Sequence, residues 1–173
     1  MEKQNDFIGD LIIRDCKIDY RNLSGTKNEY NPNGARKFCV ILDDEDVVNR
    51  MKADGWNIKP YKPNRENHAP EWKLEVEARW RNREGELLPK RLQPRIYTLG
   101  RKKTELGEED VDQIDGANID KVSLTIRPRI WEMRGQTGVK AFVKNMYVYV
   151  TLDELDSEFE NWGEDDNELP FDD

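Results

Sequence analysis

Lysine and arginine alternate with aromatic residues in several stretches of the sequence. This pattern suits a surface that holds a polyanion carrying flat rings, because cations at short spacing can neutralise phosphates while an aromatic face between them stacks a base. Stacking of this kind contributes roughly 1–3 kcal/mol per base. The pattern therefore predicts a binding site for single-stranded nucleic acid. The residues assigned to it are Lys59, Tyr61, Lys62, Arg79, Arg81, Arg127, Arg129, Trp131, Lys140, Phe142 and Lys144.

Trp131 and Phe142 are the aromatic residues that we expect to stack bases. Phe142 lies between two lysines on what should be the polar face of its strand, because its immediate neighbours form the apolar face. Trp131 follows two arginines at a period of two, so the three side chains share one face if the strand stays regular past Pro128. Trp72 and Trp80 are in phase with apolar residues of their own segment, and we expect them in the core.

The clusters that could carry catalysis each lack a required part. The four acidic residues at 43–46 coincide with the start of a predicted helix, where carboxylates cap backbone N–H groups, so capping explains them better than a two-metal site. Segment 100–104 has Lys102 where a phosphate-binding P-loop needs glycine, and Ile114 stands where a calcium loop needs an oxygen ligand. The sequence therefore predicts a binding protein rather than an enzyme, with no catalytic residue, metal or cofactor.

The formal net charge of −8 hides an uneven distribution of charge. Residues 153–173 hold eleven acidic residues and no basic one, so residues 1–152 carry 28 basic against 25 acidic residues. Residues 59–103 hold thirteen basic and six acidic residues, and residues 121–144 hold six basic and one acidic. Residues 104–120, between them, hold seven acidic and no basic residues. Because basic surfaces attract polyanions, the two basic segments favour a nucleic-acid partner.

The elements that must position these residues are mainly strands. Apolar alternation predicts strands over 7–23, with a break in register near Cys16, and over 35–42, 72–83, 95–99, 122–127 and 139–152. An apolar stripe over 43–54 predicts one short helix, capped by Asp43 or Asp44 and ended by Gly55, and 108–114 predicts a helical turn. Such a set predicts a small closed or partly open β-barrel.

No apolar stretch approaches the roughly 20 residues of a membrane span, and the first residues do not resemble a secretion signal, so no membrane contact is expected.

The acidic residues 153–173 are expected to stay disordered, because few apolar side chains offset the entropy of ordering them. We therefore divide the chain into a folded domain at 1–152 and a tail at 153–173. Residues 161–173 resemble the C-terminal tip of bacterial single-stranded DNA-binding proteins, an acidic stretch closing in Ile-Pro-Phe or Leu-Pro-Phe that docks on replication and repair proteins. The resemblance implies a docking role for Asp165, Asp166, Leu169, Pro170 and Phe171. Here, Asp172 and Asp173 follow the phenylalanine, whereas that family ends on it.

The body of the chain resembles phage-type single-stranded DNA-binding proteins. The resemblance lies in segments 31–38, 54–59, 126–132 and 138–144, which follow in order along residues 5–152. It implies an OB-fold, a five-stranded Greek-key β-barrel with one or two short helices, and binding without sequence specificity.

Together these features predict a protein that coats and protects single-stranded DNA in phage replication, recombination and repair, in the cytoplasm of the infected host cell. The tail would recruit partner proteins and compete with DNA for the basic surface, since a tethered polyanion has a high effective concentration. Two alternatives stay open: an acidic adaptor or DNA mimic that blocks a DNA-binding protein, and an RNA-binding OB module. Both a monomer and a dimer fit the sequence.

Overall fold

The computed structural model describes residues 8–62 and 69–151, and strands dominate this part of the chain. Five of the strands are β1 (Leu11–Asn22), β2 (Lys37–Leu42), β4 (Trp72–Glu77), β7 (Ile119–Met133) and β8 (Gln136–Val150). The other elements are α1 (Glu45–Asp54), β3 (Ile58–Pro60), η1 (Lys90–Leu92), β5 (Arg95–Leu99), β6 (Lys103–Leu106) and η2 (Val111–Gly116). No helix in the described ranges is long and apolar enough to cross a membrane.

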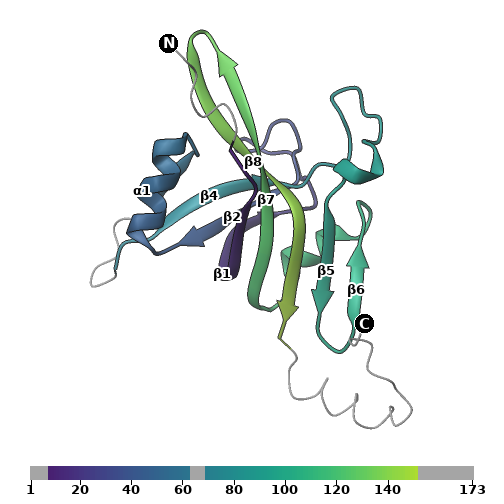
Figure 1. Cartoon of the computed structure of the whole chain (residues 1–173). Helices are drawn as coiled ribbons and strands as arrows, with labels where there is room; N and C mark the ends of the chain where they lie inside the picture. The colour runs from purple at the N-terminus through teal and green to yellow at the C-terminus, as the bar shows by residue number, and fades with distance from the viewer. Residues whose placement is uncertain (1–7, 63–68, 152–173) are drawn as a thin grey trace.

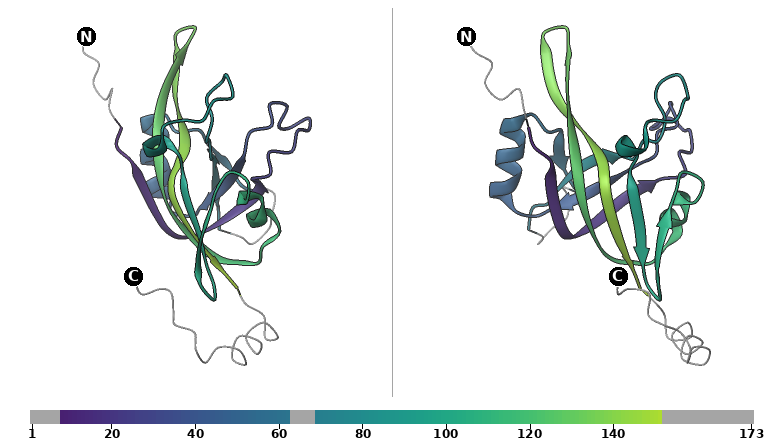
Figure 2. Two further views of the ribbon diagram at one scale, coloured as in Figure 1. Left: turned by 90° about the vertical axis from the view of Figure 1, so that its right-hand side faces the viewer. Right: turned by 45° about the vertical axis from the view of Figure 1, so that its right-hand side comes forward.

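The strands form one sheet in the order β3-β4-β2-β1-β7-β8-β5-β6, which curls until β4 also pairs with β8 (Figures 1 and 2). The closing pair is parallel and sets Val76 opposite Ala141 and Glu77 opposite Phe142, whereas the other barrel pairs are antiparallel. Strands β1, β2, β4, β7 and β8 thus make a closed five-stranded barrel with OB-fold connectivity. The predicted fold class is confirmed. Strands β5 and β6 extend the sheet beyond the barrel along β8.

The barrel interior is filled by the apolar positions of the alternating strands. Phe38, Val40, Val76, Val122 and Val148 are fully buried, and each contributes about 1.5–3 kcal/mol relative to an exposed side chain. Trp80 is buried, as expected, and Trp72 packs at the margin of the core and is half buried. Because the inward positions are apolar, charged residues at the alternate positions are left on the outer face.

Helix α1 begins where the sequence predicts. The Oδ1 atom of Asp44 accepts hydrogen bonds from the backbone N–H groups of Asp46 (3.0 Å) and Val47 (3.2 Å), and Gly55 ends the helix with φ +99°. Only a residue that tolerates the left-handed region fits at position 55 without strain. Val48 and Met51 are buried on the inward side of the helix.

Replacement of Asp44 by alanine is expected to lower the free energy of unfolding by about 1 kcal/mol, because two N–H groups at the helix start lose their acceptor. Urea denaturation followed by circular dichroism measures this difference. The neighbouring exposed Asp43 makes no cap bond, so Asp43→Ala is the matched control and should change stability by less than half as much. Equal losses in the two variants would contradict the assignment of the cap.

Strand β7 continues further than the sequence predicts. It runs through Pro128 as far as Met133, and the hairpin that it forms with β8 projects past the barrel (Figure 1). Strand β1 begins opposite Ile126, so Pro128 is paired with β8 and has no partner on the β1 side. A residue without an N–H is tolerated at such a strand edge. Arg134 and Gly135, both with positive φ, make the two-residue turn at the tip.

One other predicted strand differs in length, and the predicted irregularity of another is present. Strand β4 ends at Glu77 rather than continuing to residue 83, because the chain turns away into a connector that reaches β5. The predicted break in β1 is confirmed, since the register of its pairing with β7 shifts between Ile13 and Cys16, where Asp15 has φ +53°.

Candidate nucleic-acid interface

Four arginines surround an open pocket on the outer face of the barrel. Arg127 and Arg129 come from β7, whereas Arg79 and Arg83 come from the connector that follows β4. The cavity has a volume of about 590 Å³, and its remaining lining residues are Asn82, Glu84, Leu88, Leu92, Pro128, Phe142 and Val143. We call this site the arginine pocket. An apolar floor beneath several guanidinium groups suits a ligand that carries flat rings and phosphates.

The register of the β7–β8 hairpin explains why cations and a ring meet here. Arg127 lies opposite Phe142 and Arg129 lies opposite Lys140, so the four side chains project from the same face of the hairpin. The shared face predicted for Arg127, Arg129 and Trp131 follows from the unbroken course of β7 past Pro128.

Glu77 organises the cations around Phe142. It is only 7 % exposed, and its carboxylate bridges Lys140 (Nζ–Oε1, 2.9 Å) and Arg79 (Nε–Oε2, 3.0 Å). The same two cations lie over the Phe142 ring, with Arg79 Cζ 5.3 Å and Lys140 Nζ 5.4 Å from its centroid. Two cations share one carboxylate, so this cluster keeps a net positive charge beside the ring.

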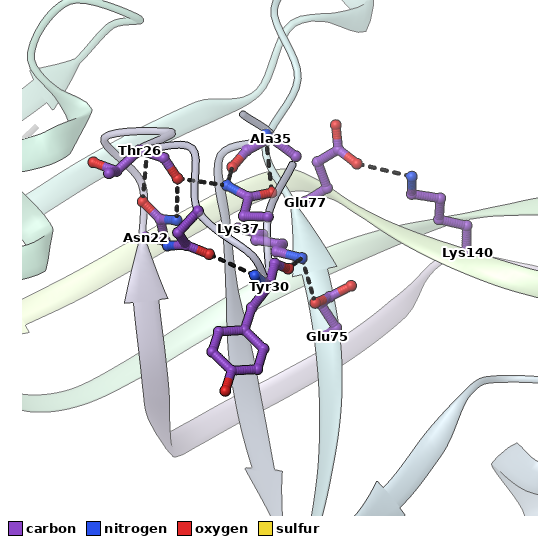
Figure 3. A network of polar contacts seen from close by, with 10 residues as sticks. Asn22, Thr26, Tyr30, Ala35, Lys37, Glu75, Glu77 and Lys140 are labelled. Carbon is purple, nitrogen blue, oxygen red and sulfur yellow. Dashed lines mark hydrogen bonds and ion pairs between the residues drawn. The ribbon is translucent and has the colours of Figure 1, made fainter. Parts of the chain in front are cut away.

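A second carboxylate of β4 is also paired. Glu75 forms an ion pair with Lys37 of β2 (Nζ–Oε2, 3.0 Å), next to the contact between Glu77 and Lys140 (Figure 3). Glu75 and Glu77 occupy alternate positions of β4 on its outer face. The acidic side chains in the middle of this surface are therefore neutralised by neighbouring cations.

Trp131 lies across the backbone of β8 near the projecting end of the hairpin. Gly138 is opposite it, and a Cβ atom at Gly138 would lie only 2.5 Å from Trp131 Cζ2, so the ring can lie against the strand only above a glycine. The side chain is 43 % exposed and, with Lys140, Glu75 and Glu77, lines a further cavity of about 490 Å³. Trp131 thus offers an accessible ring next to the cluster around Phe142.

The variant Gly138→Ala is expected to displace Trp131 and to weaken binding of oligo-dT about three- to tenfold, a part of the energy of one stacked base. Fluorescence anisotropy of a labelled oligonucleotide measures the change. Gly107→Ala is the control, because an added Cβ meets nothing within 4 Å there. Binding by Gly138→Ala equal to that of the unmodified protein would exclude a stacking role for Trp131 in its present position.

A second aromatic group, which the sequence only half predicts, lies on the outer face of β1, β4 and the segment after β3. The rings of Tyr20 and Tyr61 meet edge to face at 6.1 Å. Lys73 Nζ lies 4.7 Å from the Tyr20 ring, and Lys62 Nζ lies 5.1 Å from the Tyr61 ring. Lys59 is opposite Lys73 in the β3–β4 pair, so both project from this face.

Tyr61 is held in place by Asp19. Its hydroxyl donates a hydrogen bond of 2.5 Å to Asp19 Oδ2. Burial raises the pKa of Tyr61, and the bond to the carboxylate raises it further, so the phenol stays protonated. Partial burial alone would raise the pKa of Asp19, but the bonds from Tyr61 and the backbone of Tyr20 lower it below its usual value. Asp19 is thus an ionised acceptor at neutral pH that fixes the Tyr61 ring.

Tyr20, Tyr30 and Lys73 are absent from the sequence prediction. Tyr20 is 51 % exposed and Tyr30, in the loop between β1 and β2, is 80 % exposed. The sequence carries only a weak signal for them, because local patterns show rings and cations that are adjacent in the chain. Tyr20 and Lys73, by contrast, meet across strands that are about fifty residues apart in the chain.

The predicted residues fall into two connected groups. The first group lies around the arginine pocket and the cavity next to Trp131, and comprises Arg79, Arg127, Arg129, Trp131, Lys140 and Phe142. The second group comprises Lys59, Tyr61 and Lys62, which lie with Tyr20 and Lys73. Strand β4 joins the groups, since Lys73 and Glu77 occupy its outer face. We call the joined surface the cationic band.

Two predicted residues have other partners. Arg81 donates to both carboxylate oxygens of Glu108 (3.1 and 3.0 Å) and to the carbonyl of Gly85, which ties its turn to the segment that carries Glu108. Arg81 is not among the residues that line the arginine pocket. Lys144 forms an ion pair with Asp10 at 2.7 Å and lines a different cavity, together with Arg127. The tail residues Asp165, Asp166, Leu169, Pro170 and Phe171 lie outside the described residues.

No curated protein matches the sequence. Among solved structures, the fold is similar to the single-stranded DNA-binding protein from bacteriophage Enc34 in a C-terminally truncated form. The identity is 12 % and the TM-score is 0.51, over 84 % of this chain and 87 % of that one. The same phage protein in complex with ssDNA matches with 12 % identity and a TM-score of 0.51, over 84 % of this chain and 88 % of that one. At this identity the likeness concerns the fold.

A family model matches nearly the whole sequence. The model is described as "Putative phage ssDNA-binding domain", and it covers residues 2–171. The matched range includes every residue of the cationic band. The chain therefore belongs to the family of phage single-stranded DNA-binding domains.

Proposed function

We propose that this phage single-stranded DNA-binding protein holds its ligand along the cationic band and coats it during replication, recombination and repair in the cytoplasm of the infected cell. The arginine pocket carries the proposal. Arg83, Arg127 and Arg129 have no ion-pair partner among the described residues, although they lie around one apolar floor. Unpaired guanidinium groups gathered at one site repel one another, and phosphates would relieve that repulsion.

Each part of the band has a role in the proposal. The arginines and Lys140 contact phosphates, whereas Phe142, Trp131, Tyr20 and Tyr61 contact base faces. Every base offers a face on which a ring can stack, so such a surface binds without sequence preference. No catalytic step is assigned to the chain.

The tail has a separate role in the proposal. We divide the chain at residue 152 into the barrel domain and the acidic segment 153–173, which both recruits replication or recombination proteins and competes with DNA for the band. The eleven acidic residues of that segment support this role, because they complement the arginines of the arginine pocket in charge.

Titration of the intrinsic tryptophan fluorescence with oligo-dT at several salt concentrations tests the proposed function. Stacking on Trp131 should quench the emission, and the logarithm of the affinity should fall with the logarithm of the salt concentration by about 0.7 per neutralised phosphate. An adaptor or DNA mimic would show neither effect. Stronger binding of oligo-rU than of oligo-dT would favour the RNA-binding alternative.

A further inference from the structure

A second basic pocket lies beside the arginine pocket, and most of its lining residues are not among the predicted binding residues. It has a volume of about 480 Å³. Its lining contains five cations and one carboxylate, and comprises Lys90, Arg91, Gln93, Pro94, Arg95, Glu105, Arg127, Lys144 and Asn145. We call it the outer pocket. Arg127 lines both pockets, so the two are neighbours on one surface.

The wall between the pockets is the short helix η1 with the residues before it. Leu88 and Leu92 line the arginine pocket, whereas Lys90 and Arg91 line the outer pocket. The wall is fixed, because Gln93 Nε2 donates to the Leu88 carbonyl at 2.8 Å and the Leu92 N–H donates to the Pro89 carbonyl at 2.8 Å. Its two faces therefore present apolar contacts to one pocket and cations to the other.

Strand β5 supplies the far side of the outer pocket. It runs parallel to β8 and places Arg95 opposite Asn145, next to Lys144. Strand β5 is not part of the closed barrel. The added strands and η1 thus extend the cationic surface beyond the five barrel strands.

Charge is the main reason to assign a ligand to this pocket. Lys90, Arg91 and Arg95 are exposed, and none has an ion-pair partner within 8–62 or 69–151. Glu105 is the only acidic residue of the lining. Like charges held together by fixed backbone raise the local potential and attract an anion.

The chemistry of the lining favours a nucleic-acid backbone over the acidic tail. Pro94 is the only apolar residue among those that line the outer pocket, whereas the arginine pocket has a floor of five apolar residues. A peptide tip that inserts leucine and phenylalanine needs such a floor. Phosphates need only cations and hydrogen-bond donors, which the lysine, arginine, Gln93 and Asn145 side chains supply.

We propose that single-stranded DNA leaves the arginine pocket, crosses η1 and places further phosphates in the outer pocket. This inference rests on the proposed function and adds a second phosphate subsite to it. Arg127 bridges the two subsites. The consequence is a longer binding site, so the outer pocket contributes only to ligands that are long enough to cross η1.

The test compares two double charge reversals and two lengths of oligo-dT. Lys90→Glu with Arg91→Glu changes the outer pocket. Arg50→Glu with Lys102→Glu makes the same change in net charge on exposed residues that line neither pocket. Anisotropy of labelled oligonucleotides of about 6 and about 20 nucleotides, within and beyond the range of one OB-fold site, gives the affinities.

The outer-pocket variant should bind the long oligonucleotide about tenfold more weakly than the control variant, with a salt dependence lower by about 1.4 for two lost phosphate contacts. Its affinity for the short oligonucleotide should stay within about twofold of the control, because a short ligand fills only the arginine pocket.

Four other outcomes overturn the inference, and they differ from one another. Equal affinities of the two variants for the long oligonucleotide mean that the outer pocket holds no DNA. An equal loss for both lengths means that the pocket is part of one short site. Tighter binding by the outer-pocket variant means that the pocket holds the acidic tail. Failure of the unmodified protein to bind either oligonucleotide contradicts the proposed function itself.

Discussion

Replacement of both Arg127 and Arg129 by alanine is expected to lower the affinity for oligo-dT by about 30- to 100-fold. Each guanidinium can make a charge-assisted contact with a phosphate, and such contacts contribute about 1.5–3 kcal/mol before screening. Two of them, partly screened by solvent, correspond to a loss of about 2–3 kcal/mol in binding free energy. The plot of log affinity against log salt should also become less steep, by about 1.4, because two phosphate contacts are lost.

The fold should survive this double substitution. Neither arginine has an ion-pair partner in the described part of the chain, and their apolar neighbours Val122, Leu124 and Ile126 fill the core. Arg50→Ala with Lys102→Ala removes the same charge elsewhere and serves as the control. A loss of affinity that is the same in both variants would mean that net charge, rather than the arginine pocket, drives binding.

Removal of residues 153–173 is expected to tighten binding of oligo-dT about tenfold at low salt, because a tethered polyanion at millimolar effective concentration no longer competes for the cationic band. The gain should shrink as salt rises, since screening weakens the tail and the DNA contacts together. Anisotropy titrations of the full chain and of the truncated chain across salt concentrations measure both effects.

Two further variants distinguish the effect of the tail's charge on DNA binding from the effect of its sequence. A tail of unchanged length with asparagine and glutamine in place of the acidic residues should behave like the truncation. A scrambled tail that keeps all eleven acidic residues should behave like the natural one. If the protein with the scrambled tail binds oligo-dT as tightly as the truncated protein, the Leu-Pro-Phe tip, rather than charge, occupies the site. An affinity for oligo-dT that is unchanged after truncation would exclude competition by the tail.

The barrel could be predicted because its strands and helix follow local rules. Period-two alternation marks β4 and the start of β7, and the Asp44 cap with Gly55 bounds α1 in the sequence itself. The length of β7 could not be predicted, because Pro128 normally ends a strand. Here the pairing of β7 with β1 ends at Ile126, and β7 continues past Pro128 with β8 as its partner.

The candidate site could be predicted only where one strand carries it. Arg127, Arg129 and Trp131 share a face of β7, and period-two counting finds that face. Contacts between distant strands were not accessible in this way. The meeting of Lys73 with Tyr20 depends on the order of strands in the sheet, and the bridge from Glu77 to Lys140 depends on barrel closure.

Arg81 shows that a residue predicted to bind DNA can be paired with a carboxylate that is distant in the sequence. It lies between aromatic and basic neighbours in the sequence, yet the fold brings Glu108 within 3.0 Å of its Nε atom. Glu108 belongs to the acidic segment 104–120, and its approach to Arg81 is a tertiary contact. A count of charges along the chain therefore overestimates the cations that are available to a ligand.

Photo-crosslinking with single-stranded DNA that carries halogenated uracil, followed by mass spectrometry of the adducts, tests the central claim most directly. A base stacked on a ring gives an adduct at that residue. We expect adducts at Phe142 and Trp131 and at Tyr20 or Tyr61, all of which should disappear with excess unlabelled oligo-dT. Tyr97 of β5 and Tyr147 of β8 stack on each other at 5.3 Å, and with Tyr149 of β8 they lie outside the cationic band. Adducts confined to these three tyrosines would contradict the account.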